Sequence, residues 1–340
     1  MVYILLASQV RCKCSTRINN KRNDKMPQSH LPKKLSLGEQ STNHIVLIEP
    51  AVFYANPETM DSNAYQVRAQ LGTNEASEVV YKKALAEFHA FRGLLLQNSV
   101  AVTTLYGSEH CPDHIFPNWI STHRTEDGQG VIYYPMLNEN RQKERTPEIR
   151  QFFERHYDLI FDMSDFEKEN RCLEANGSLC LDRANKVAYA ALSVRTDEDL
   201  ARKWADKTGY ELMTFSTKGP DGKPVYHTDL VMWIGTDVAT ICAEAVDDAD
   251  RERVLERLGK GRNVVELSAA QMNSFCGNSL EVQSIAGDKM LVMSSAAYDA
   301  LTPEQLEVFS KHYTKLLHSP IPTIEEHGGG SARCLMLEMF

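Results

Sequence analysis

The sequence has no apolar run that approaches the roughly 18–20 residues a bilayer-spanning helix needs. The apolar residues 2–7, VYILLA, are too few for the core of a secretory signal, and no basic residues precede them. Hydrophobic residues nevertheless make up 42% of the chain, which excludes disorder of the whole. We therefore predict a globular protein without a membrane partner.

Cysteine is sparse, and its spacing lacks a zinc-binding pattern. The 340 residues contain eight cysteines and no paired CxxC motif. A chain of this length does not need disulfides for stability, so we expect reduced thiols and a cytoplasmic or organellar location. Cys12 and Cys14 form a lone C-x-C in a segment we expect to be loose. We therefore expect no metal.

Acidic residues outnumber basic ones outside the first 40 positions. Residues 1–40 hold eight Lys/Arg and two Asp/Glu, whereas the whole chain carries a net charge of −9, which leaves −15 on residues 41–340. An acidic body argues against nucleic-acid binding. It would attract a cationic small molecule, although the same charge also serves plain solubility.

The basic N-terminal segment suits two interpretations. It is rich in Arg, poor in acids and bears Ser and Thr, as organellar transit peptides do, and it equally suits a disordered extension. We assign residues 1–40 to such a segment and residues 41–340 to a single catalytic domain. The location is then cytoplasmic or, with a transit peptide, mitochondrial.

A supersecondary unit recurs in the second half of the chain with a period of about fifty residues. Its first strands begin near residues 178, 227 and 279. Each copy reads as strand, strand, helix, strand. The predicted elements are strands 176–183, 186–193 and 211–215 with a helix capped by Thr196; strands 225–235, 238–245 and 263–268 with helix 248–260; and strands 277–284 and 289–294 with helix 302–317.

The first half fits the same unit less clearly. Residues 44–49 and 99–105 read as strands around an amphipathic helix at 78–97, whose Phe88 and Leu95 share one face. About five units fit in 300 residues. Radial repetition of small sheets predicts a single α/β domain built as a five-bladed propeller.

Four residues at equivalent places in the units could carry chemistry. Glu174 precedes the first strand of one unit, His227 and Asp229 share a face on the first strand of the next, and Cys334 lies in the last strand after Gly328–Ser331. Equivalent positions of a radial repeat converge on its axis. Singly, these residues are more typical of packing or surface ion pairs, so the prediction depends on their joint arrangement.

These residue types suit attack on a guanidinium carbon, which is a poor electrophile. A cysteine thiolate is a better nucleophile than water, and a histidine can protonate the departing amine and then activate water. A carboxylate such as Glu174 would orient the imidazole, and Asp229 could grip the planar cation. Glycines such as Gly329 and Gly330 would let the backbone approach a flat substrate.

The same residues lie in blocks that resemble the amidinotransferase-like branch of the guanidino-group modifying enzymes, the pentein superfamily. The sequence is most similar to citrulline-hydrolase-like and uncharacterised amidinotransferase members, over residues 44–340. The matching blocks, in order, are residues 48–66, 116–123, 133–145, 173–183, 226–235, 277–282 and 321–340. The last block, IPTIEEHGGGSARCLMLEMF, is the most specific.

The resemblance implies a five-bladed α/β propeller, a covalent cysteine intermediate and no metal or organic cofactor. It implies that Cys334 is the nucleophile, His227 the general acid/base, Glu174 the carboxylate that orients it, and Asp229 a substrate-binding acid. The chain departs from the family at FPNW (116–119), where relatives read FPNNW. No acid occurs in FPNWISTH, so Asn118 is the substitute we expect, and a neutral ureido compound such as citrulline becomes a candidate substrate.

Three classes of function remain open from the sequence. The leading one is a hydrolase of C–N bonds in small guanidino or ureido compounds, arginine- or citrulline-like. The second is an amidinotransferase, in which an amine replaces water as the acceptor. The third is a non-catalytic binding protein on the same scaffold. The sequence does not indicate an oligomeric state.

Overall fold

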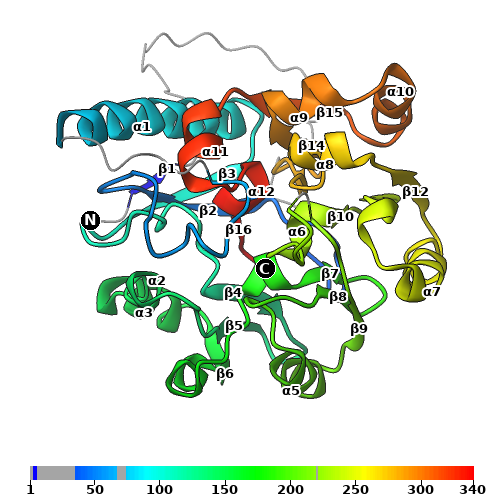
Figure 1. Cartoon of the computed structure of the whole chain (residues 1–340), viewed down its shortest axis with the longest axis horizontal. Coiled ribbons are helices and arrows are strands. Elements are labelled where there is room, and N and C mark those ends of the chain that lie inside the picture. The colour runs from blue at the N-terminus through cyan, green and yellow to red at the C-terminus, as the bar shows by residue number, and fades with distance from the viewer. Residues whose placement is uncertain (1–2, 6–34, 67–73, 220) are drawn as a thin grey trace, which may run out of the picture.

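The computed structural model describes residues 3–5, 35–66, 74–219 and 221–340. Five small sheets are arranged around a common centre, with helices outside them (Figure 1). This is the predicted five-bladed α/β propeller. In the described part of the chain no helix is long and apolar enough to cross a membrane.

Four blades are three-stranded sheets with the same connectivity. In each, the first strand pairs antiparallel with the second, and the second pairs parallel with the third across a helical connection. This is the strand–strand–helix–strand unit read from the sequence. The strands are β4 (Ile120–Arg124), β5 (Gln129–Tyr133) and β6 (Asp158–Asp162); β7 (Cys180–Asp182), β8 (Val187–Ala191) and β9 (Glu211–Phe215); β10 (Met232–Ile234), β11 (Val238–Ile241) and β12 (Asn263–Glu266); and β13 (Leu280–Gln283), β14 (Lys289–Ser294) and β15 (Lys315–Ser319).

The fifth blade joins the two ends of the body. Its inner strand β16 (Leu337–Glu338) comes from the C-terminus and pairs antiparallel with β2 (His44–Glu49), which pairs parallel with β3 (Ala101–Tyr106). A further short strand, β1 (Tyr3–Leu5), pairs antiparallel with β3. The ring is therefore closed by strand pairing between segments almost 300 residues apart.

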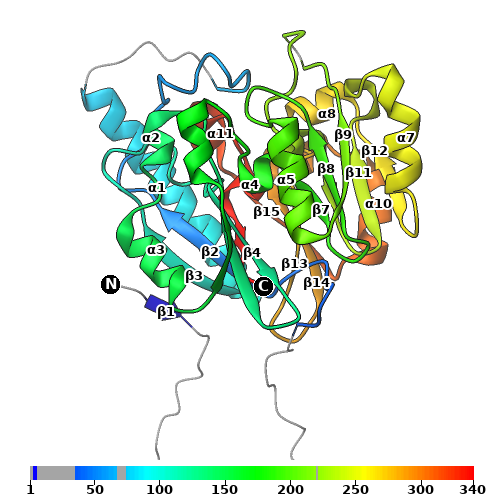
Figure 2. The ribbon, with the colours of Figure 1, turned by 90° about the horizontal axis from the view of Figure 1, so that it is seen from below.

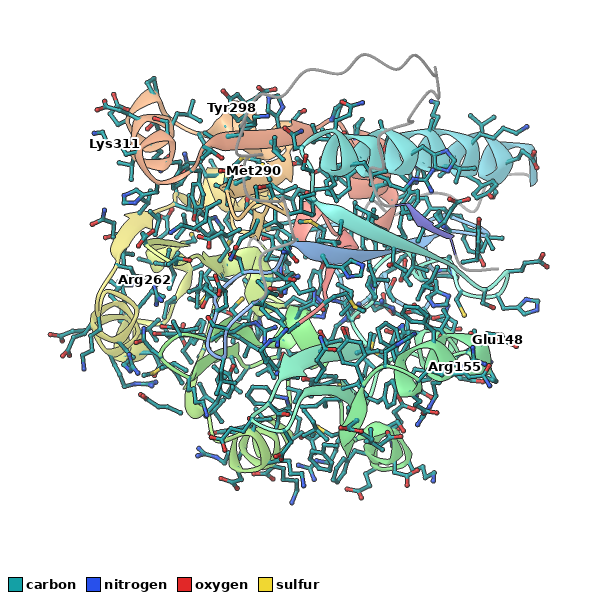
Figure 3. The ribbon with its side chains drawn as sticks, turned by 180° about the vertical axis from the view of Figure 1, so that it is seen from behind. Glu148, Arg155, Arg262, Met290, Tyr298 and Lys311 are labelled. Atoms are coloured by element: carbon teal, nitrogen blue, oxygen red, sulfur yellow. The ribbon has the colours of Figure 1, made fainter. Side chains whose placement is uncertain are left out.

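The helices cover the outside because each has one apolar face. In α5 (Glu198–Thr208), Leu200 and Trp204 are fully buried, while charged residues face outward. Figure 3 shows Glu148 and Lys311 on the outer helices, pointing away from the ring. The longer helices are α1 (Asn74–Gln97), α3 (Pro147–Glu154), α7 (Asp248–Leu258), α10 (Pro303–His312) and α11 (Pro322–Gly328), with α2 (Glu139–Gln142), α8 (Ala269–Asn273), α9 (Ser295–Ala300) and the 3-10 helices η1 (Ser164–Glu169) and η2 (Ala243–Ala245) between elements.

Single helical turns precede three of the inner strands, where the sequence predicted strand. These turns are α4 (Ala175–Ser178), α6 (Thr228–Val231) and α12 (Ala332–Leu335). Glu174 and His227 flank the first two, whereas Asp229 and Cys334 lie within helical turns. The prediction that His227 and Asp229 share a strand face is therefore wrong. A four-residue turn has too few residues for its periodicity to be read against the adjacent strand.

Smaller differences concern element ends. The predicted helix 302–317 is α10 followed by β15, because Leu317 is needed as a buried strand residue beside β14. The cap of α5 is Asp197, whose carboxylate accepts from the Leu200 N–H, and not Thr196.

The prediction for residues 1–40 falls mainly outside the described residues. Of its last six residues, Gln40 is buried, and its side chain donates to the carbonyls of Leu181 and Ile234.

Candidate active site

Cys334 lies on α12, just before the inner strand of the fifth blade, and is almost fully buried. Its thiol faces the Asp229 carboxylate, with 3.4 Å between Sγ and Oδ2. Asp229 lies on α6, in front of the third blade's inner strand. The convergence of equivalent positions thus brings the cysteine and this acid into contact across 105 residues of sequence.

Asn278 also contacts the cysteine, and the sequence did not single it out. Its Nδ2 lies 3.2 Å from Cys334 Sγ and donates to the Asp229 carbonyl at 3.1 Å. Its Oδ1 accepts from the backbone N–H groups of Arg333 and Cys334. Asn278 comes just before β13, the inner strand of the fourth blade. Glu174, His227 and Cys334 likewise come just before the inner strands of their blades. The GNS triplet at the start of that repeat was the available signal.

His227 and Glu174 form a buried pair. The imidazole Nε2 lies 2.8 Å from Glu174 Oε2, and the two residues flank α6 and α4 on neighbouring blades. The ring rests on Gly177, where an added Cβ would stand 2.5 Å from two ring atoms. The predicted carboxylate–histidine pair is therefore present, and both its hydrogen bond and its packing fix the ring.

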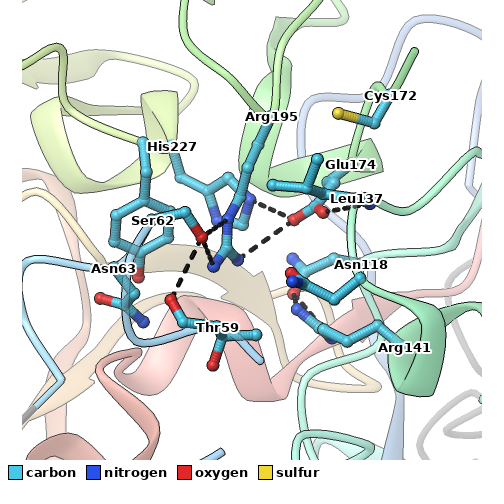
Figure 4. A network of polar contacts seen from close by, with 12 residues as sticks. Thr59, Ser62, Asn63, Asn118, Leu137, Arg141, Cys172, Glu174, Arg195 and His227 are labelled. Atoms are coloured by element: carbon cyan, nitrogen blue, oxygen red, sulfur yellow. Dashed lines mark hydrogen bonds and ion pairs between the residues drawn. The ribbon is translucent and has the colours of Figure 1, made fainter. Parts of the chain in front are cut away.

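Glu174 is held as an anion. Burial raises the pKa of this carboxyl, but the Arg195 guanidinium and the His227 imidazole more than offset it, so the pKa lies well below its usual range. Arg195 Nη1 lies 3.4 Å from Oε2, and the Leu137 N–H donates to Oε1 at 3.1 Å (Figure 4). A fixed anion at Nε2 leaves the other ring nitrogen of His227 for proton transfer.

The resting cysteine is a thiol. Burial raises the pKa of Cys334, and the Asp229 carboxylate raises it further, while the Ser331 backbone and Asn278 oppose the shift. Burial also raises the pKa of Asp229, and the nearby His227 lowers it in part. The thiolate and the Asp229 anion disfavour each other, so a cation placed between them would favour both.

Asp113 is a second acid that the sequence did not identify. It is fully buried three residues before Phe116 and lines the same pocket as Cys334 and His227. Oδ2 accepts from Asn56 and Thr59, whereas Oδ1 has no partner among the described residues. The expectation that this side of the site lacks an acid is therefore wrong. The carboxylate comes from Cys111-Pro112-Asp113, just upstream of FPNW.

Asn118 is where the sequence placed it, beside the pocket, but it contacts an arginine. Its Oδ1 accepts from both terminal nitrogens of Arg141 at 3.3–3.4 Å, and its Nδ2 donates to Asn176 Oδ1. Arg141 also makes a bidentate ion pair with the buried Glu144. Asn118 thus orients a charged group at the pocket wall.

The glycines predicted to approach the substrate have different surroundings. Gly329 adopts φ +65°, and a Cβ there would stand 2.5 Å from the Asn63 side chain. Its carbonyl accepts from the Tyr226 hydroxyl at 2.5 Å. Gly330 lines the pocket and lies against Phe116. Absence of side chains here lets the loop before Cys334 pack closely against the protein itself, and of these two glycines Gly330 borders the pocket.

A loop from the N-terminal half covers the site. Ser62 Oγ accepts from Nε and Nη2 of Arg195 at 3.2 and 2.7 Å. The Asn63 amide donates to the Gly328 carbonyl, and Gln66 donates to the His327 carbonyl. Figure 4 shows this loop crossing in front of Arg195 and His227. Residues far apart in sequence thereby enclose the cysteine.

The resulting pocket is small and narrow. Five of its lining residues have ionisable side chains: Asp113, Arg141, Arg195, His227 and Cys334. The other lining residues are Asn63, Phe116, Asn118, Tyr226, Gly328 and Gly330. Figure 2 places α2, α4 and α11 toward one side of the ring, with β1 and the C-terminus toward the other. The described residues include no group of three or more His, Cys, Asp or Glu side chains that could hold a metal.

The five-bladed ring of small sheets is the pentein fold. More specifically, residues 49–340 match the model of the family described as N,N dimethylarginine dimethylhydrolase, eukaryotic, and the chain belongs to that family. No curated protein sequence matches the chain.

Solved structures show the same fold at low identity. The N-terminal domain of ArgZ, an arginine dihydrolase from Cyanobacteria solved covalently bound to a reaction intermediate, superposes with a TM-score of 0.69 at 16% identity, covering 87% of this chain and 97% of that one. Unliganded AgrE gives 0.69 at 17% identity, over 87% of this chain and 39% of that one. A Cys-to-Ser variant of the dimethylarginine hydrolase DDAH from Pseudomonas aeruginosa, complexed with citrulline, gives 0.58 at 16%, over 88% and 100%.

Proposed function

We propose that this protein is a cysteine hydrolase that cleaves a C–N bond of a small guanidino compound, with Cys334 as nucleophile. The observation that carries the proposal is the pocket's arrangement of charge around a nucleophile. A thiol and a carboxylate-held histidine share one pocket, and two buried carboxylates beside them each have an unpaired oxygen, Asp113 Oδ1 and Asp229 Oδ1.

The unpaired carboxylates favour a cationic substrate. Leaving a buried charged group unsatisfied costs more than the roughly 1–3 kcal/mol of an unpaired neutral group, so such oxygens suit a ligand that donates to them. Around the pocket, Arg141 pairs with Glu144 and Arg195 faces Glu174. Asp113 and Asp229 each keep one oxygen, Oδ1, without a hydrogen-bond partner among the described residues. A guanidinium, with planar paired N–H donors, matches two such carboxylates. The argument for a neutral ureido substrate rested on a missing acid, and Asp113 supplies one.

The first half-reaction forms a bond from Cys334 Sγ to the guanidinium carbon. Binding of the cation stabilises the thiolate that burial and Asp229 otherwise disfavour, and His227 takes up the thiol proton. His227 then returns this proton to the departing nitrogen as the C–N bond breaks. Ammonia or an amine leaves, and the remaining amidino carbon stays bound to sulfur.

The second half-reaction returns the enzyme to its starting state. Water attacks the sulfur-bound carbon while His227 accepts one of its protons, and the anion of Glu174 stabilises the imidazolium. The C–S bond breaks, Cys334 regains its proton, and a ureido product is released. Acid and base are thus the same residue acting in turn.

The relatives agree with this chemistry. The matched family is described as a dimethylarginine hydrolase, ArgZ as an arginine dihydrolase, and the DDAH structure holds citrulline, a ureido compound. Arginine and N-methylated arginines are accordingly the first substrates to test. The amidinotransferase alternative uses the same residues, and no contact in this pocket favours an amine acceptor over water.

Assay of the purified protein with arginine, methylarginines, agmatine and citrulline tests the proposal. We expect release of ammonia or a methylamine with a ureido product from at least one cationic substrate. Cys334→Ala should abolish this release while the protein keeps its thermal unfolding transition, since removal of one sulfur is a small packing change.

Cys242→Ala is a matched control, because Cys242 is also fully buried but lies outside the pocket. It should retain activity. More than a few per cent of wild-type turnover in Cys334→Ala would rule out the nucleophile, and transfer of the amidino group to glycine in place of hydrolysis would establish the transferase.

A further inference from the structure

The Asn278 side chain uses both ends of its amide at the active-site cysteine. Its oxygen accepts from the N–H groups of Arg333 and Cys334 at 3.0 and 3.3 Å, and its nitrogen donates to the Asp229 carbonyl and lies 3.2 Å from Cys334 Sγ. The residue is fully buried. Every contact therefore involves a neighbour of the sulfur or the sulfur itself.

These contacts determine which end of the amide faces the sulfur. Two backbone N–H donors meet one end of the side chain and a backbone carbonyl meets the other. The reversed amide would place its NH₂ against two donors and its oxygen against a carbonyl, losing all three hydrogen bonds. The NH₂ group, a donor without acceptor capacity, thus faces Sγ.

We propose that Asn278 is a further catalytic residue, whose Nδ2 amide donates to the Cys334 thiolate while its Oδ1 fixes the turn that carries the sulfur. The proposal rests on the proposed role of Cys334 as nucleophile. In the resting state the S–H proton points to Asp229 Oδ2, so sulfur can accept from the amide. When the proton leaves, the contact with Asp229 becomes repulsive and the amide hydrogen bond becomes charge-assisted, hence stronger.

The two roles can be separated by substitution. Asn278→Asp keeps an oxygen for the Arg333 and Cys334 N–H groups but replaces the donor beside sulfur with a negative oxygen. Asn278→Ala removes both. If Asn278 only positions the turn, the Asp variant should resemble the wild type. If it stabilises the thiolate, the Asp variant should be the more impaired of the two.

The measurement is alkylation of Cys334 by iodoacetamide across a neutral-to-alkaline pH series, without substrate, read by mass spectrometry of the Cys334 peptide. The midpoint of the rate profile reports thiol ionisation, and its plateau reports access to the sulfur. We expect the midpoint to move to higher pH in Asn278→Ala and further in Asn278→Asp. At a fixed pH below the midpoint, the rate in Asn278→Ala should fall by about tenfold or more, as expected for losing a hydrogen bond to a charged group.

Ser279→Ala is the matched control, since Ser279 is the buried neighbour whose Oγ donates only to the Cys276 carbonyl among the described residues. Its profile should equal that of the wild type. Wild-type midpoints in both Asn278 variants, or a shift in Ala but not in Asp, would overturn the proposal. Should Asn278→Ala not fold, Asn278→Asp and Asn278→Ser decide by the same readout. Alkylation requires no turnover, so failure here is distinct from loss of the proposed hydrolase activity.

Discussion

At the scale of the residue, Asp229 has two opposing effects on Cys334. It accepts a hydrogen bond from the Cys334 thiol at 3.4 Å, and its anion disfavours the thiolate that the proposed mechanism requires. Only a cation in the pocket relieves this conflict. With a neutral substrate, formation of the thiolate beside the Asp229 anion would not be offset by a positive charge. The charge at Asp229 should therefore matter most for cationic substrates.

Asp229→Asn should therefore cost a cationic substrate far more than a neutral ureido one. The amide keeps hydrogen bonding but loses the charge, and charged hydrogen bonds contribute roughly 1.5–3 kcal/mol against about 1 for neutral pairs. We expect kcat/KM for a guanidino substrate to fall about tenfold or more. Glu174→Gln is the comparison, because it acts through His227 and should lower kcat for all substrates alike.

Asp229 and the second buried acid, Asp113, predict a pH dependence of substrate binding. Burial raises the pKa values of Asp113 and Asp229, so these carboxyls remain neutral to higher pH than usual and bind a cation only once ionised. KM for a guanidino substrate should consequently fall as pH rises through these raised pKa values. Steady-state kinetics of wild type and Asp229→Asn test both points. Equal losses on cationic and neutral substrates would show that Asp229 is structural.

At the scale of the element, the single turn α4 positions His227 because it has a glycine, Gly177, where the imidazole ring packs. His227 lies against Gly177, which has no Cβ to displace it. One turn thus fixes the ring at two points, by the Glu174 carboxylate at Nε2 and by Gly177 against the ring atoms. Helical turns this short have little stability of their own, and packing against the inner strands holds them.

Gly177→Ala should lower kcat by roughly tenfold or more while leaving the fold in place, because an added methyl would stand 2.5 Å from the imidazole and force it to move. Gly93→Ala in α1 is the control. No atom lies within 4 Å of its added Cβ, and removing a helical glycine should stabilise by about 0.5–1 kcal/mol. Kinetics and thermal unfolding of both variants check this. Wild-type kcat in Gly177→Ala would show that the ring tolerates displacement.

At the scale of the whole molecule, the ring depends on a two-residue strand. β16 pairs with β2 through Leu337 with Val46 and Glu338 with Ile45. Leu337, Met339 and Phe340 are buried, and the Arg183 guanidinium lies 3.9 Å from the centroid of the Phe340 ring. The last described residues therefore close the propeller, and they directly follow α12, which carries Cys334, the proposed nucleophile.

Deleting residues 337–340 should destabilise the protein severely. Each large apolar side chain removed contributes about 1.5–3 kcal/mol, and three of them approach the roughly 5–15 kcal/mol that stabilises a whole domain. Thermal unfolding should shift strongly downward or lose cooperativity. Deleting residues 1–34, by contrast, should leave kinetics nearly unchanged, because the described site residues lie between Asn56 and Cys334 and the only strand lost from the described sheets is the three-residue edge strand β1. Intact cooperativity without 337–340 would contradict closure by β16.

The sequence by itself determined the repeat, the propeller and four central site residues. Apolar periodicity reports which face of an element is buried. The fifty-residue period is recognised over whole units, so it does not depend on an error at one element end, such as the predicted end of the helix at α10. It also located Cys334, His227, Glu174 and Asp229, since equivalent places in a radial repeat must converge.

Tertiary structure alone decided the remainder of the site. Asp113 stands in ordinary sequence surroundings, and the GNS triplet at Asn278 indicates the start of a repeat but not a contact with the cysteine. Ring closure places the carboxylate at the pocket and the amide at the sulfur. The replacement of predicted strand by α4, α6 and α12 has the same origin. Local propensity is weak over four residues, so the contacts between neighbouring blades determined their conformation.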